Sequence, residues 1–182
     1  LTSGEYTGLA VTRVLESIRL TDPQIKYYQA SSSEIFGNSI KSYQNENTPF
    51  QPQSPYAVAK LYGYWTTKIY RDGYNMFATN GILFNHESPT RGLEFVTRKI
   101  SNAIARITLG LQKKLVLGNL NGSRDWGYAP EYVEGMWKTL QQKNPNDYVL
   151  STDETHTVKE FVELAFSHVE LDWKKYVTTD KK

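Results

Sequence analysis

The stretch Ser54-Pro55-Tyr56-Ala57-Val58-Ala59-Lys60 begins the longest helix that the sequence predicts, and the rest of the fold can be built outward from it. Serine followed by proline is a favourable helix start, because the serine side chain caps the first turn and proline lacks an N–H that this turn would leave unbonded. Alanine, lysine, leucine and aromatic residues follow. We therefore predict a helix over about residues 56–70.

Apolar residues at helical spacing predict another helix before this one, over about residues 9–18, ended by Asp22-Pro23. A short strand is expected over residues 25–30. The polar segment 38–54 contains two prolines and predicts a long surface loop, a kind of loop that is often functional.

Helices and strands continue to alternate towards the carboxyl terminus. Strands are expected at 77–84, 115–117 and 148–150, a loop at 85–92, helices at 95–109 and 131–142, and a last helix at the capping box that runs from Thr157 to Glu160. This order predicts an α/β fold, a doubly wound, mostly parallel sheet with helices on both faces. Ligands of such folds gather at the carboxyl ends of the strands.

The composition is that of a globular protein of one domain or slightly more: 182 residues, 39% hydrophobic and 13% aromatic. The 21 basic and 19 acidic residues nearly cancel, so we expect neither a nucleic-acid partner nor a membrane partner. Cysteine is absent, which excludes thiolate chemistry and zinc bound by sulfur and suits the cytoplasm. We expect no metal site.

Tyr56 and Lys60 stand four residues apart on the predicted helix, so the ammonium lies beside the phenol. A phenol ionises near pH 10, and a neighbouring positive charge favours the phenolate, which makes such a tyrosine a usable general base. The spacing alone is not specific, because Tyr64 and Lys68 repeat it.

The serines that follow the predicted strand favour the first pair. Ser32 lies at the carboxyl end of that strand, where its hydroxyl could bond to the same substrate hydroxyl that Tyr56 deprotonates. In extended backbone, side chains two apart share a face, so Glu34 is expected to join Ser32 while Ser33 turns away. The alternative is an ordinary polar turn without a function.

These residues, in Ala30-Ser31-Ser32-Ser33-Glu34-Ile35-Phe36-Gly37 and the stretch quoted first, resemble the extended short-chain dehydrogenase/reductases that act on nucleotide sugars. Three further stretches, 80–89, 95–100, and 117–120 with 124–127, narrow the resemblance to the GDP-mannose 4,6-dehydratase family. It implies a Rossmann-like fold with a smaller substrate-binding domain, NADP as cofactor, GDP-mannose as substrate and a homo-oligomer, either a dimer or a tetramer.

The resemblance also implies roles, residue by residue. Ser32 occupies a position that the family usually fills with threonine, Glu34 matches the acid/base carboxylate, Tyr56 the phenolate base, and Lys60 the lysine that also holds the nicotinamide ribose. Cofactor-contacting positions match Tyr56 and Lys60 again, together with His86 and Arg91. Positions at the substrate diphosphate match Asn85 and Arg124. The implied reaction is oxidation at C4, loss of water across C5 and C6, and return of the hydride to C6.

The single carboxylate in Ser32-Ser33-Glu34 favours this family over dTDP-glucose dehydratases, which carry a second acid there, and over epimerases, which need none. Two alternatives stay open: another nucleotide-sugar dehydratase or epimerase, and a non-catalytic sugar-nucleotide binding module. The second is kept open because the sequence contains no G-x-G-x-x-G turn to cradle the cofactor phosphates.

We therefore expect the chain to be the middle portion of such an enzyme, without the first half of the Rossmann-like sheet. The expected division is 1–90 for the second half of the catalytic domain, 91–130 for part of the nucleotide-sugar-binding domain, and 131–182 for a return to the sheet and a continuation into the substrate domain.

Overall fold

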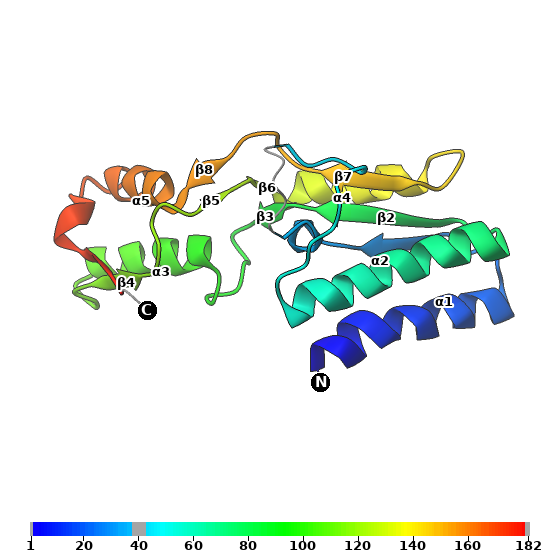
Figure 1. The fold of residues 1–182 in the computed structure, drawn as a ribbon. Coiled ribbons are helices and arrows are strands. Elements are labelled where there is room, and N and C mark those ends of the chain that lie inside the picture. Colours follow the sequence, from blue (N-terminus) through cyan, green and yellow to red (C-terminus); the bar gives the residue numbers. More distant parts are fainter. Residues whose placement is uncertain (1, 38–42, 181–182) are drawn as a thin grey trace. The chain divides into compact units, whose positions relative to one another are not determined.

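The computed structural model describes residues 2–37 and 43–180, which form two compact units (Figure 1). The first unit is made from residues 1–84 and 130–151, and the second from residues 85–129 and 152–182. The chain therefore leaves the first unit after its second strand and returns to it for one more helix and strand.

The first unit contains a three-stranded parallel sheet with the order β1-β2-β7, in which β2 is central. Its elements are a π-helical turn Gly4–Leu9, α1 Ala10–Thr21, β1 Tyr27–Ala30, a 3-10 turn Ser33–Ile35, α2 Pro55–Tyr74, β2 Ala78–Leu83, α4 Ala129–Leu140 and β7 Asp147–Leu150.

Helices cover both faces of this sheet. Ile82 of β2 and Val149 of β7 pack with Tyr64 of α2 on one face. The next residue of β7, Leu150, points to the opposite face, where its methyl group would lie 3.0 Å from a Cβ placed on Gly135 of α4. Figure 1 shows α1 beside α2. The predicted α/β fold with a parallel sheet and helices on both faces is confirmed.

Helix α2 begins as its sequence predicts and runs further. Ser54 has extended backbone, and its hydroxyl accepts a hydrogen bond from the N–H of Ala57 at 3.1 Å, with Pro55 in the first turn. The helix ends where Asn75 takes a left-handed conformation (φ 53°), a common helix stop. It therefore extends four residues beyond the predicted end at residue 70, because no strong helix breaker stands before Asn75.

The carboxylate of Asp147 joins α2 to β2 and β7 inside the first unit. Arg71 donates to both of its oxygens, at 2.8 and 3.1 Å, and Tyr64 and Asn80 each donate at 2.8 Å. Burial by itself raises the pKa of the Asp147 carboxyl, but hydrogen bonds from Arg71, Asn80 and Tyr64 outweigh burial and lower it below its usual value. Arg71 also donates to the carbonyl of Ala78, so this buried network fixes α2 against the central strand.

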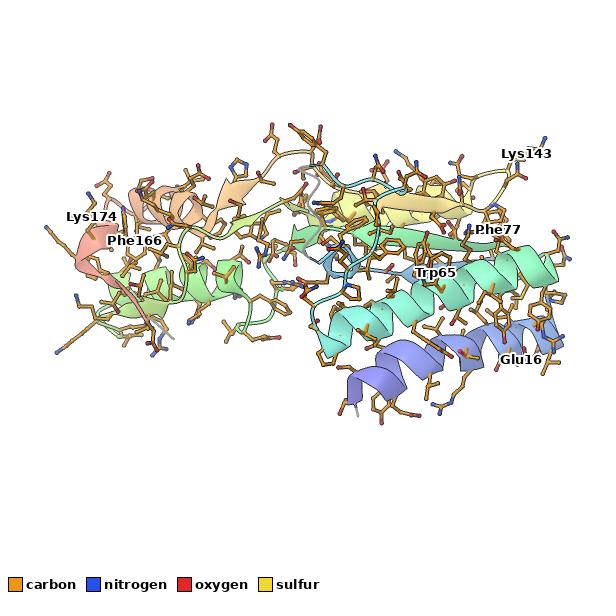
Figure 2. All side chains as sticks on the ribbon, in the orientation of Figure 1. Glu16, Trp65, Phe77, Lys143, Phe166 and Lys174 are labelled. Carbon is orange, nitrogen blue, oxygen red and sulfur yellow. The ribbon has the colours of Figure 1, made fainter. Side chains whose placement is uncertain are left out.

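In the second unit, the described residues form three short strand pairs and two α-helices around a core of their own. The pairs are parallel β3 with β6, parallel β4 with β9, and antiparallel β5 with β8. Phe166 of α5 (Figure 2) is fully buried with Ile100 of α3 and Leu115 of β4. The elements are β3 Asn85–Glu87, α3 Val96–Thr108, β4 Leu115–Leu117, β5 Ser123–Arg124, β6 Trp126–Tyr128, β8 His156–Thr157, α5 Val158–Ser167, a 3-10 turn Trp173–Lys175 and β9 Val177–Thr179.

Most predicted elements are present, with changes at their ends. The predicted capping box is formed: Thr157 accepts from the N–H of Glu160, and Glu160 accepts from that of Thr157. The strand expected from residue 25 starts at Tyr27, because the N–H of Ile25 still closes a turn onto the carbonyl of Asp22. The helix predicted over 131–142 lies at Ala129–Leu140.

Of the two predicted loops, one was wrong at its start and the other is described only in part. The loop predicted over 85–92 was wrong at its start, because β3 pairs there with β6. A strand of three polar residues is too short to show the alternation that identifies strands in a sequence. In the loop predicted over 38–54, residues 43–54 contain no helix or strand, and residues 38–42 lie outside the described residues. Within the described ranges, no helix is both long and apolar enough to cross a membrane.

The first prediction concerns the Asp147 network. Arg71→Met leaves the buried carboxylate without its cation, and breaking a buried ion pair from one side costs about 3–5 kcal/mol. We expect the free energy of unfolding of the first unit to fall by about that amount in urea titrations. The control is Arg13→Met, because the 64% exposed Arg13 pairs with Glu5 at the surface, where such pairs contribute about 0–1 kcal/mol.

The loss should also depend on pH. Because the folded-state pKa of Asp147 is lowered, its stabilisation is complete above about pH 4 and is lost as the pH falls through the folded-state pKa. Arg71→Met should weaken this loss of stability at acid pH. Equal effects of the two substitutions at neutral pH would contradict a central role of the network.

Candidate active site

The carboxyl end of β1 leads directly into the predicted serine segment. Ser32 has extended backbone (φ −151°, ψ 143°), and its hydroxyl oxygen accepts a hydrogen bond from the N–H of Glu34 at 3.2 Å, which starts the 3-10 turn Ser33–Ile35. The prediction that Glu34 shares a strand face with Ser32 was therefore wrong. A serine oxygen that caps the following N–H ends the extended backbone, so the two-residue alternation stops at Ser32.

Gly37 closes this segment in a conformation that only glycine adopts easily. Its φ is +54°, and a Cβ there would lie 1.7 Å from the carbonyl oxygen of Gln51. The N–H of Gln51 in turn donates to the carbonyl of Ile35 at 3.0 Å. The turn that carries Ser32 and Glu34 is thus held against the chain that leads into α2.

Lys60 connects α2 to the end of β1. Its ammonium donates to the carbonyl of Ala30 at 2.8 Å and lies 5.6 Å from the centre of the Tyr56 ring. Burial lowers the pKa of Lys60. Tyr56, on the first turn of the helix, is 42% exposed. The Tyr56 ring and the Lys60 ammonium therefore lie at the carboxyl end of β1, close to the backbone that continues into Ser32.

The second Tyr-x-x-x-Lys pair of α2 has a different environment. Tyr64 is 4% exposed, and its hydroxyl donates to Asp147 at 2.8 Å. Burial and the bond to Asp147 raise the pKa of Tyr64, so this phenol stays protonated and belongs to the core. Lys68 lies near Asp72 on the helix surface, at 3.7 Å. The geometry supports the choice of Tyr56 and Lys60 over Tyr64 and Lys68.

The arrangement in the first unit can donate, accept and orient protons on a bound hydroxyl. The Ser32 oxygen accepts from Glu34, which leaves its own proton for a ligand oxygen. The Glu34 side chain is exposed on the 3-10 turn.

Sequence reasoning missed the carbonyl of Ala30 as the anchor of Lys60, because every residue has a backbone carbonyl and no residue type reveals which one binds a side chain.

The other four predicted site residues lie in the second unit. Asn85 and His86 form β3, opposite Trp126 and Gly127 of β6. The guanidinium of Arg91 lies 3.5 Å over the ring centre of Phe95, and its Nε lies 3.3 Å from a carboxylate oxygen of Glu87.

Arg124 lies on β5, directly opposite His156 of β8. Its side chain is exposed and donates to the carbonyl of Ser123 at 2.7 Å. The next residue, Asp125, is buried and accepts hydrogen bonds from the N–H and hydroxyl of Thr152 and the N–H of Asp153. Asp125 therefore joins the residue after β5 to the segment that precedes β8. No carboxylate among the described residues forms an ion pair with Arg124.

The whole chain matches one family model. The model described as GDP-mannose 4,6 dehydratase matches residues 1–182. GDP-mannose 4,6 dehydratase 1 of Arabidopsis thaliana is 55% identical over 99% of this chain and 51% of its own length. The GDP-mannose 4,6 dehydratase of Homo sapiens is 50% identical over 91% of this chain and 46% of its own length. The chain spans about half the length of the curated relatives it matches.

Solved structures share the fold. RMD from Pseudomonas aeruginosa, complexed with NADPH, has a TM-score of 0.90 at 20% identity, over 96% of this chain and 61% of that chain. The dTDP-glucose 4,6-dehydratase of Bacillus anthracis str. Ames, in complex with NAD, has a TM-score of 0.84 at 23% identity, over 97% of this chain and 56% of that chain. This likeness supports the Rossmann-like α/β fold.

Proposed function

Because this chain belongs to the GDP-mannose 4,6-dehydratase family, we propose that it carries the catalytic residues for converting GDP-mannose to GDP-4-dehydro-6-deoxymannose. The observation that carries the proposal is the end of β1, where Lys60 is bonded to the carbonyl of Ala30 beside a half-exposed Tyr56. At the second pair with this spacing, Tyr64 lies in the core and Lys68 lies on the helix surface.

Tyr56 is proposed as the base that takes the proton of the sugar C4 hydroxyl. The nearby Lys60 ammonium favours the phenolate, and the Ser32 hydroxyl donates to the same sugar oxygen and holds it in place. A nicotinamide cofactor, when bound, supplies the hydride exchange, taking hydride from C4 and returning it to C6. Loss of proton and hydride leaves a ketone at C4.

Glu34 is proposed as the group that acts at C5 and C6. The C4 ketone makes the C5 proton acidic, so a carboxylate can remove it. The C5–H bond breaks with its proton going to the carboxylate, a double bond forms between C5 and C6, and the C6 hydroxyl leaves as water with a proton from the same carboxyl. When hydride adds to C6, a proton returns to C5, which balances the proton that Tyr56 took from the C4 hydroxyl. The exposed position of Glu34 on the turn beside Ser32 suits a group that must reach a neighbouring sugar carbon.

NADP is the proposed cofactor. The residues present fit its nicotinamide ribose, because Lys60 uses one N–H for Ala30 and has further N–H groups for ribose hydroxyls. Two solved structures with this fold are described in complex with NADPH or NAD, which supports a nicotinamide cofactor. His86 and Arg91 are proposed as further cofactor contacts.

Asn85 and Arg124 are proposed to bind the substrate diphosphate. A guanidinium presents a fork of donors that matches paired phosphate oxygens, and Arg124 is exposed and without an ion-pair partner among the described residues. For residues 85–129 and 152–182 we accordingly propose a nucleotide-sugar-binding role, and a catalytic role for the first unit. The absence of cysteine favours a cytoplasmic location.

A homo-oligomer is proposed from the outer surface of α2. Val58, Tyr62, Trp65 and Ile69 recur at helical spacing and are 43–60% exposed, which leaves an apolar stripe open on the helix. A groove of about 660 Å³ lies at one end of this stripe, between α2 and the π-helical turn Gly4–Leu9. A second copy of the chain could bury this stripe against its own.

The main test of the function compares the two tyrosines of α2. In the full-length protein, Tyr56→Phe keeps the ring but removes the proton acceptor, and we expect kcat for GDP-mannose to fall by about 10²- to 10⁴-fold. Tyr64→Phe removes a core hydrogen bond and should lower the melting temperature while kcat stays near wild type. Equal losses of activity would contradict the assignment of Tyr56.

The role of Glu34 can be tested with Glu34→Gln. The oxidation at C4 should continue, because Tyr56, Lys60 and Ser32 are intact, whereas the elimination should stall. Single-turnover absorbance of reduced nicotinamide should therefore rise and persist, and solvent deuterium should enter C5 slowly or not at all. Formation of the 6-deoxy product at the wild-type rate would show that the carboxylate takes no part.

The oligomer can be tested by placing charge on the stripe. We expect Tyr62→Glu with Trp65→Glu to convert the protein to smaller species in sedimentation experiments, because burying an unpaired charge in an apolar interface is costly. The control is Leu164→Glu, which places the same charge on an exposed leucine of α5. A monomeric wild type, or an unchanged assembly in the double variant, would refute the interface.

A further inference from the structure

A line of hydrogen bonds runs along β1 beneath α2 and ends at Lys60. The hydroxyl of Tyr27 donates to Oε1 of Gln29 at 2.5 Å, and Nε2 of Gln29 donates to the carbonyl oxygen of Ala30 at 3.2 Å. The same oxygen accepts the bond from Nζ of Lys60 at 2.8 Å. One carbonyl thus holds both a buried amide and the ammonium of the proposed catalytic lysine.

Gln29 is placed in the interior although it is polar. It is 6% exposed, and α2 lies so close over it that a Cβ on Gly63 would be 3.1 Å from its Nε2. A buried amide is costly unless its groups are bonded, and here both ends have partners. Burial raises the pKa of Tyr27 to about 12, so its hydroxyl remains a donor to Gln29 at neutral pH.

We propose that Gln29 is a positioning residue for Lys60: its amide, held by Tyr27, fixes the carbonyl of Ala30 and through it the ammonium that serves Tyr56. The proposal rests on the proposed function for its catalytic consequence. Its structural part, the coupling of Gln29 to Lys60, does not depend on which reaction the site performs.

The shared carbonyl limits both the distance between the two nitrogens and the freedom of the lysine side chain. Because both nitrogens bond to one oxygen, their separation cannot exceed the sum of 3.2 and 2.8 Å. A lysine side chain has four rotatable bonds, so an ammonium anchored to a mobile carbonyl would have no fixed position. Ala30 is the last residue of β1, and the peptide group that follows it is held on one side by the bond from the Ser31 N–H to the carbonyl of Gly81, at 2.9 Å. The amide of Gln29 adds a restraint on the other side, at the oxygen that Lys60 binds.

The coupling is tested first without enzyme activity. Gln29→Glu places a carboxylate of the same shape beside Lys60, and an opposite charge within about 6 Å favours the charged ammonium by roughly 1 pH unit or more. The pH dependence of acylation of Lys60 by acetic anhydride, read by peptide mass spectrometry, should shift upward by that amount. Acylation of Lys68, the matched lysine two turns along α2, should not change. An unchanged profile at Lys60 would overturn the proposal.

The second test separates positioning from stability. Gln29→Met alone leaves the part-buried Tyr27 hydroxyl without its partner, so the double variant Tyr27→Phe with Gln29→Met removes both polar groups and should recover most of the lost stability. If Gln29 positions Lys60, kcat of the double variant stays roughly 10- to 100-fold low with KM for GDP-mannose unchanged. Recovery of kcat along with the melting temperature would show a merely structural role.

The control is Thr139→Val, which removes a buried hydroxyl bonded to the carbonyl of Met136 on α4 and should lower stability without moving kcat or the Lys60 profile. The two proposals fail in different ways. A wild type without activity on GDP-mannose refutes the proposed function but leaves the acylation test valid. If the wild type is active but Gln29→Glu leaves the pH profile of Lys60 acylation unchanged, only the positioning role is refuted.

Discussion

The first unit depends on one buried carboxylate, that of Asp147 at the start of β7. Three side chains donate to it, from α2 and from the central strand, and together they overcome the cost of taking its charge out of water. Because two donors, Tyr64 and Arg71, lie two turns apart on α2, the network fixes both the position and the rotation of that helix over the sheet. The residues at the start of α2 belong to the same helix, so the Asp147 network also determines where they lie.

The rotation of α2 explains why identical spacings have different consequences. Tyr56 and Tyr64 each precede a lysine by four residues, yet the second lies in the core on Asp147, whereas the first lies where β1 has ended and the helix begins. At that end the cationic partner of the tyrosine bonds to a strand carbonyl. The same helix therefore serves packing at its middle and, in the proposed function, chemistry at its amino terminus.

Much of the fold could be predicted from local patterns. The cap Ser54-Pro55, the capping box of Thr157 and Glu160, and the buried run at β2 identify their elements because each signal depends on nearby residues alone. Short strands such as β3 could not be predicted, because three polar residues show no alternation of polar and apolar side chains. The partner strand of β3 also lies about forty residues away in the sequence. The direction of Glu34 was predicted wrongly, because a single serine cap changed extended backbone into a turn.

The sequence by itself determined the family, the α/β order of elements, and the candidate residues Ser32, Glu34, Tyr56 and Lys60. These features depend only on residue types and on their spacing along the chain. Tertiary structure alone decided which tyrosine is buried, which carbonyl anchors Lys60, and that Gln29 and Tyr27 stand behind that carbonyl. The physical reason is that burial and hydrogen-bond partners depend on segments distant in sequence. Every residue has a backbone carbonyl, so only the folded structure shows which carbonyl accepts a bond from a side chain.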